Sequence, residues 1–139
     1  EMCIRDRAAV EGTQTAATKA MLIVREAYEA MRNNACINPE HDFDALAHAI
    51  GVAWIRAVQI AGEDEFTNTM LPILRLANDA LARSKERFMR IGRMAFDGPA
   101  IDQVAAGIEV YESILQSSSP AQMTMAADER LAAILGVMQ

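Results

Sequence analysis

One feature constrains the fold of this chain more than any other: apolar residues return once per helical turn through five successive stretches. Spacings of three and four residues place such side chains on one side of an α-helix. None of the stretches alternates apolar and polar residues in the manner of a half-buried β-strand. The pattern therefore predicts an all-α fold of about five amphipathic helices.

Helix-breaking residues separate the five stretches and predict where the helices begin and end. Asn38-Pro39 is a typical start, because asparagine can cap free backbone N–H groups and proline fits the first helical position. Ser119-Pro120-Ala121-Gln122 matches a capping box, the sharpest local signal in the chain. The predicted helices cover approximately residues 8–33, 38–62, 64–92, 98–117 and 119–138.

The third stretch is long, and we expect it to be the spine of a bundle whose short connections make successive helices antiparallel neighbours. Pro72 interrupts its hydrogen-bond ladder, so either the helix kinks there or Thr69 caps a new helix with Pro72 in its first turn. We expect Phe66 and Leu81 on the buried face of this helix and Ile108 on that of the fourth. The expected buried stripe of the fifth helix consists of Met123, Ala127, Leu131, Ile134 and Met138.

Length and composition indicate one globular domain. A chain of 139 residues with 52% apolar and 23% charged residues can bury a sizeable core, and we expect residues 8–139 to form a single domain. Residues 1–7 resemble translated sequencing-adapter sequence, and we expect them to be a non-native leader. The most apolar window, residues 45–61, is shorter than the roughly 20 apolar residues that span a bilayer. We therefore expect no membrane segment. Two cysteines are too few for a disulfide framework, so we expect a cytoplasmic protein.

No motif in this sequence predicts an enzyme. There is no glycine-rich phosphate loop, no Gly-x-Ser-x-Gly elbow and no Cys-x-x-Cys pair. Cys36 lies in a predicted loop five residues before His41, but a lone loop cysteine is more often incidental than an activated thiol. We therefore expect a protein that is not an enzyme and that carries no cofactor.

One weak metal candidate is present in the second predicted helix. His41, Asp44 and His48 are three and four residues apart, which places them on one side of the helix. Two imidazoles and a carboxylate could hold a divalent ion with an open position. The alternative is a solvated face with an Asp44–His48 pair one turn apart, and it is favoured because no fourth ligand is in sight.

The second helix carries a partial second apolar face, and this is the predicted interface. Val52 and Ile55, with His48 and Gln59 around them, lie away from the main apolar stripe of the same helix. A helix that is apolar on two sides is either central in a bundle or packed against another chain. Nine methionines fit either an adaptable core or a pliable contact surface.

A basic cluster stands out in a chain of net charge −6. Arg83, Arg87 and Arg90 align on one side of the third predicted helix, with Lys85 and Arg93 close by. Such a face can grip phosphates, or it can be a solvated helix end that is favoured by the helix dipole. An acidic protein is repelled by phosphate backbones overall, so nucleic-acid binding is an alternative rather than the leading prediction.

The leading functional prediction is a non-enzymatic protein-interaction or regulatory accessory protein of bacterial or phage origin, which binds a protein partner or self-associates. The first alternative is a nucleic-acid-associated factor that uses Arg83, Arg87 and Arg90. The second alternative is a small-ligand or metal binder in the bundle. An unfilled apolar pocket between the second and third helices would favour that last alternative, and a solid core would disfavour it.

Overall fold

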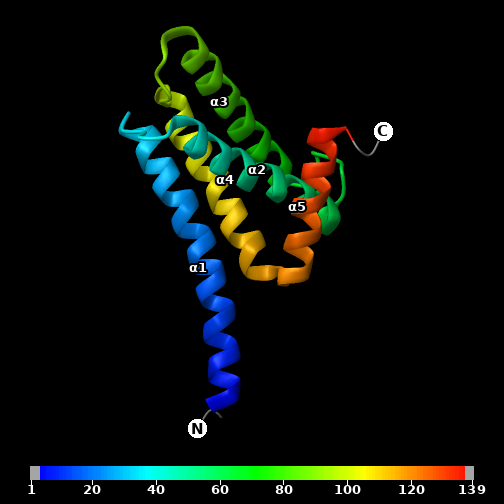
Figure 1. Ribbon diagram of the computed structural model, residues 1–139. Coiled ribbons are helices and arrows are strands. Elements are labelled where there is room, and N and C mark those ends of the chain that lie inside the picture. Colours follow the sequence, from blue (N-terminus) through cyan, green and yellow to red (C-terminus); the bar gives the residue numbers. More distant parts are fainter. Residues whose placement is uncertain (1–3, 137–139) are drawn as a thin grey trace.

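The computed structural model describes the backbone of residues 4–136 and the side chains of residues 17–136. Over this range the chain forms five α-helices and no β-strand (Figure 1). The helices are α1 (Ile4–Arg32), α2 (Pro39–Ala61), α3 (Met70–Ile91), α4 (Gly98–Ser117) and α5 (Pro120–Leu135). The predicted all-α fold with five helices is confirmed for the described residues. The proposed leader and single-domain organisation remain predictions.

The capping residues predicted for the second and fifth helices make the expected hydrogen bonds. The Asn38 side chain accepts a hydrogen bond from the His41 backbone N–H at the start of α2. At the start of α5 the Ser119 hydroxyl accepts from the Gln122 backbone N–H, and the Gln122 side chain accepts from the Ser119 backbone N–H. Both halves of the predicted capping box are therefore present.

The start of α3 differs from the sequence prediction. The helix begins at Met70 rather than near residue 64, so Pro72 lies in its first turn, where a missing N–H breaks no hydrogen bond. Thr69 occupies the cap position without a side-chain hydrogen bond, and the Asn68 side chain accepts from the Met70 N–H instead. The second of the two alternatives for Pro72 is therefore the observed one, with Asn68 doing the capping.

A buried asparagine explains the non-helical segment before α3. The Asn68 amide donates to the carbonyls of Ala57 and Gly62, each at 2.8 Å, and so ties this segment to the end of α2. Phe66 lies in the resulting turn and is 97% exposed, so its predicted place in the core is wrong.

The main core lies between the first four helices, and α2 is at its centre. The buried cluster takes side chains from α1, α2, α3 and α4 and includes Leu81 and Ile108, as predicted. Among the described helices, α2 packs extensively against all four others, whereas α3 packs chiefly against α2 and α4. The spine is therefore α2 and not α3, because α2 is the helix with two apolar faces.

Figure 1 shows how the outer helices are arranged around α2. The first half of α1 projects beyond the other helices, and its second half packs against α2 and α4. After α4 the chain reverses at Ser118 and Ser119, and α5 runs back beside α2. No helix in the described part of the chain is both long enough and apolar enough to cross a membrane.

Candidate functional site

The predicted interface residues lie where α5 meets α2, a contact that we call the α2–α5 seam. His48, Val52, Ile55 and Gln59 share one face of α2 through their three- and four-residue spacing. The Gln59 amide donates to the Glu129 carboxylate of α5 at 3.5 Å, which places this face against α5. The four residues thus share one face of α2, where Val52 is buried within the same chain while His48 and Gln59 stay exposed.

The two proposed apolar anchors, Val52 and Ile55, are fully or partly buried. Val52 is 2% exposed, and Ile55 is half-buried. Val52 and Ala126 of α5 are both buried, yet neither belongs to the main core cluster. Of the two alternatives for this face, Val52 shows burial within its own chain, because α5 returns along the second apolar face of α2 and covers it.

Polar side chains close one end of the seam. Arg56 is buried, and its Nε donates to the Ser118 hydroxyl at 3.2 Å while a terminal guanidinium nitrogen donates to the Gln59 amide oxygen at 2.7 Å. Gln59 in turn donates to Glu129. This chain of hydrogen bonds joins α2 to the turn before α5 and to α5 itself.

Arg130 is the most unusual charge at the seam. Its side chain lies over Gly51, and within residues 17–136 it makes no hydrogen bond or ion pair. Burial lowers the pKa of the Arg130 guanidinium, and the nearby Asp44 opposes that effect. Burial and the charge of Arg130 together lower the pKa of His48. A second positive charge at His48 is therefore disfavoured at this seam.

The opposite side of α5 is apolar and open. Three large apolar side chains are mostly exposed there, with Leu131 at 55% and Ile134 at 60%. We call this the α5 outer surface, and it comprises Leu131, Ile134 and Leu135. The predicted buried stripe of the fifth helix is therefore wrong at Leu131 and Ile134. The helix turns Ala126 toward α2 instead; Met138 lies outside the described residues.

The metal candidate is not assembled. Residues 17–136 contain no group of three histidine, cysteine, aspartate or glutamate side chains that could hold a metal ion, although the sequence puts His41, Asp44 and His48 on one helix side. His41 is exposed in the first turn of α2. The Arg130 guanidinium acts on both Asp44 and His48, and a cation there opposes the binding of another.

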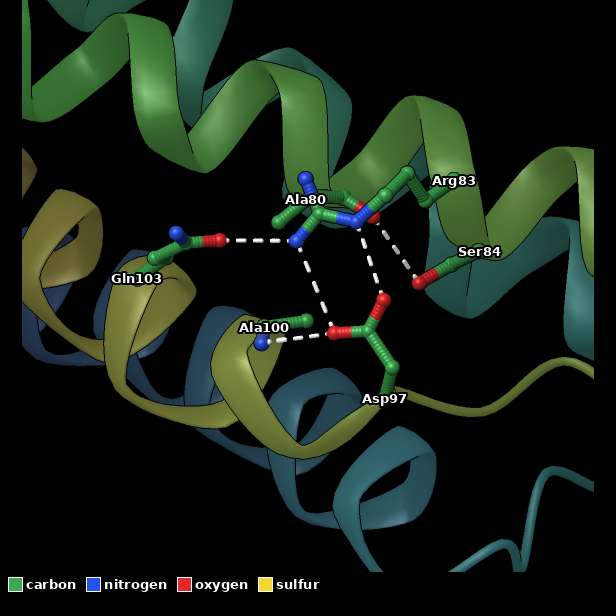
Figure 2. Close-up of polar contacts among 6 residues, drawn as sticks. All are labelled: Ala80, Arg83, Ser84, Asp97, Ala100 and Gln103. Atoms are coloured by element: carbon green, nitrogen blue, oxygen red, sulfur yellow. Dashed lines mark hydrogen bonds and ion pairs between the residues drawn. The ribbon is translucent and has the colours of Figure 1, made fainter.

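The predicted basic face is divided by an ion pair between α3 and α4. Arg83 donates to Asp97 at 2.9 Å and to the Gln103 side-chain oxygen at 2.8 Å, and Figure 2 shows how these side chains face one another. Asp97 also accepts from the Ala100 N–H at the start of α4, and the Arg83 hydrogen bond is the main cause of its lowered pKa. Arg83 therefore does not join Arg87 and Arg90 as a free phosphate-binding group.

Cys36 has the environment of an inert thiol. Its Sγ donates to the Met94 carbonyl at 3.5 Å. Burial and the adjacent Asp42 raise the pKa of Cys36 to about 12, so the thiolate is scarce at neutral pH. This agrees with the sequence interpretation of an incidental loop cysteine.

A cleft lies between α2 and α3, the location where an unfilled apolar pocket would favour the ligand-binding alternative. Its volume is about 380 Å³. Trp54 of α2 supplies an aromatic wall and Asn78 of α3 supplies an amide donor, whereas Arg75 of α3 is ion-paired with Glu65. The remaining lining residues are Ile50, Gly51 and Leu74.

Comparison of this chain with models of protein families, with curated proteins and with solved structures finds no match.

Proposed function

We propose that this protein is a non-enzymatic protein-interaction protein that binds its partner through the α5 outer surface. One observation carries the proposal: α5 fully buries only Ala126 and exposes Leu131, Ile134 and Leu135 on one side. A helix that only stabilised its own chain would be expected to bury its large apolar residues and expose its small ones. An apolar surface that the chain itself leaves open is typical of a binding site for another protein.

The geometry of the α5 outer surface suits a helical partner. Leu131, Ile134 and Leu135 are three and four residues apart, which is the spacing that lays side chains into the groove of an opposing helix. Fully burying a leucine or isoleucine contributes about 1.5–3 kcal/mol, so covering the exposed parts of these residues contributes roughly 1 kcal/mol each. These three residues together contribute about 3 kcal/mol, so a stable contact also needs the surface around them.

A double variant tests the proposal. Leu131→Ser with Ile134→Ser makes the α5 outer surface polar without touching the α2–α5 seam. Leu22→Ser with Ile23→Ser is a matched control, because these α1 residues are 54% and 50% exposed on another helix. We expect the first variant to lose partner binding in co-purification from the native host. The control should keep it, and equal binding by the two variants would overturn the proposal.

The cleft between α2 and α3 supports a second candidate function, the binding of a small aromatic carboxylate. Trp54 offers a ring for stacking and Asn78 offers an amide donor for a carboxylate, while the Arg75 guanidinium, already paired with Glu65, adds positive charge. Trp54 is the only tryptophan of the chain, so its fluorescence reports on the cleft directly. Saturable quenching by benzoate that is lost in Asn78→Ala would support this function. An unchanged Trp54 emission at millimolar benzoate would exclude it.

A further inference from the structure

The attachment of α5 to the rest of the chain is narrow. Among the described helices it is the one that packs extensively against a single neighbour, α2. Of its residues only Ala126 is fully buried, and only Ser118 and Ser119 connect it to α4. Leaving the seam would therefore disturb none of the contacts among α1, α3 and α4.

The ends of α5 are determined within its own segment. The capping box of Ser119 and Gln122 and the proline at the first position define its start. At its end Gly136 adopts a left-handed conformation with φ 72°, and its N–H bonds to the Ala133 carbonyl. These hydrogen bonds do not involve α2, so α5 can keep its helical limits when it changes position.

The link before α5 needs little change to open. Ser118 has φ −113° and ψ 148°, and Ser119 has φ −74° and ψ 157°. Both residues already have extended backbones, so a different direction of α5 requires only modest dihedral changes there. Pro120 keeps α4 and α5 from fusing into one helix, because proline disrupts a helix interior.

An open α2–α5 seam would expose Val52 and Ile55 together with the buried Arg56. The helix that fits this surface best is another copy of α5, because it brings the same Glu129 for Gln59 and the same Arg130 over Gly51. A second chain thus repeats the contacts at Gln59 and Gly51, and the change falls on the link through Ser118 and Ser119.

We infer that α5 exchanges between two copies of this chain, so that each copy's α2 is covered by the partner copy's α5 in a domain-swapped dimer. The inference rests on the proposed function in so far as α5 is the interacting helix in both. It adds a second contact surface, the α2 face at Val52 and Ile55, to the α5 outer surface.

Crosslinking between two differently tagged copies tests the exchange. In a background with both native cysteines replaced by serine, one copy carries Gln59→Cys and the other carries Glu129→Cys. The side chains at these positions meet across the seam at 3.5 Å, so a short bismaleimide can join them. We expect a covalent heterodimer whose yield rises with the protein concentration during mixing. A single chain that carries both substitutions provides the internal check that the reagent spans the seam.

The contact between Arg25 of α1 and Glu112 of α4 is the matched control, because it does not involve α5. Arg25→Cys in one copy and Glu112→Cys in the other should give only the background of random encounters. The exchange is wrong if the Gln59→Cys and Glu129→Cys copies give no more heterodimer than this control while the double variant crosslinks within its own chain.

The Leu131→Ser/Ile134→Ser change separates the two proposals. Introduced into both crosslinking copies, it should leave heterodimer formation unchanged if exchange occurs through the seam. Loss of partner binding in that variant without any intermolecular crosslink would support the α5 outer surface and overturn the exchange. Intermolecular crosslinking with partner binding unaffected by the variant would support the exchange and overturn the proposed function.

Discussion

The side chain of Arg130 on α5 lies across Gly51 on α2, in the space that a Cβ atom at position 51 would occupy. Its Cδ is 2.7 Å from that Cβ position. The absence of a side chain at Gly51 thus allows a long basic residue to lie along α2 beside Asp44 and His48. This relationship fixes α5 on the second apolar face of α2 and leaves Leu131 and Ile134 pointing outward.

Gly107→Ala should destabilise the whole core. A Cβ at position 107 would lie 2.6 Å from the Ala77 Cβ and 2.8 Å from the Ile50 Cδ1, so α4 would have to move away from α3 and α2. Overpacking of this kind costs about 1–3 kcal/mol, and the better helix propensity of alanine offsets up to about 1 kcal/mol. We expect a net loss of about 1–2 kcal/mol in the free energy of unfolding, measured by urea denaturation. An unchanged midpoint would contradict the close approach at Gly107.

Gly51→Ala should be milder and local. The displaced group is the flexible end of Arg130, which can move without shifting a helix. We expect hydrogen exchange to become faster in α5 while α3 and α4 keep their protection. A loss of protection spread evenly over all helices would show that Gly51 supports the core rather than the seam.

Phe66 and Leu81 form a contrasting pair that tests the observed boundary of α3. Phe66→Ser should change the free energy of unfolding by no more than about 0.5 kcal/mol, because the side chain is already in solvent. Leu81→Ala should cost about 2–5 kcal/mol, because Leu81 is 1% exposed in the main core. Similar losses in thermal denaturation for both variants would mean that Phe66 is buried.

Asn68→Ala should release the turn before α3. The substitution leaves the Ala57 and Gly62 carbonyls without the amide that they share, at a cost of about 1–3 kcal/mol. We expect proteolysis to become faster within residues 62–69, together with a lower melting temperature. Thr67→Ala is the control, since the Thr67 hydroxyl makes one exposed hydrogen bond to the Asp64 carbonyl. Equal behaviour of the two variants would remove Asn68 as the cause of the late start of α3.

The seam should weaken in mild acid through His48. Its folded-state pKa lies below 6.5, so the detached or unfolded state binds the proton more tightly. Stability therefore falls as the pH drops below about 6.5, where a protonated His48 would face the Arg130 guanidinium. We expect the free energy of unfolding of His48→Gln to vary less between pH 7 and pH 5.5 than that of the parent chain. Identical pH slopes would exclude this coupling.

Much of the fold follows from local chemistry, which explains why the sequence predicts it. The caps at Asn38 and Ser119 depend on residues within one turn, and both are observed. The start of α3 could not be predicted in this way, because it depends on Asn68 bonding to carbonyls of α2. The exposure of Phe66 follows from that same contact.

The candidate site, like the fold, was predictable only where it depends on residues close together in the sequence. The two apolar faces of α2 were visible in the spacing of Val52 and Ile55, but the helix that covers them was not. The orientation of α5 depends on the position of Arg130 over Gly51, which the sequence does not reveal. If α5 were rotated about its axis by one residue, Ala127 would be buried in place of Ala126. No sequence pattern indicated Arg130 or Glu129, because both residues act only through their contacts with α2.

Photocrosslinking from the α5 outer surface tests the central claim most directly. A benzophenone amino acid replaces Leu131, and in a control variant it replaces the exposed Ala82 of α3. On irradiation in the native host, we predict protein adducts of discrete mass from position 131 and none from position 82. An absence of adducts at position 131, or the same adducts from both positions, would contradict the assignment of α5 as the interacting helix.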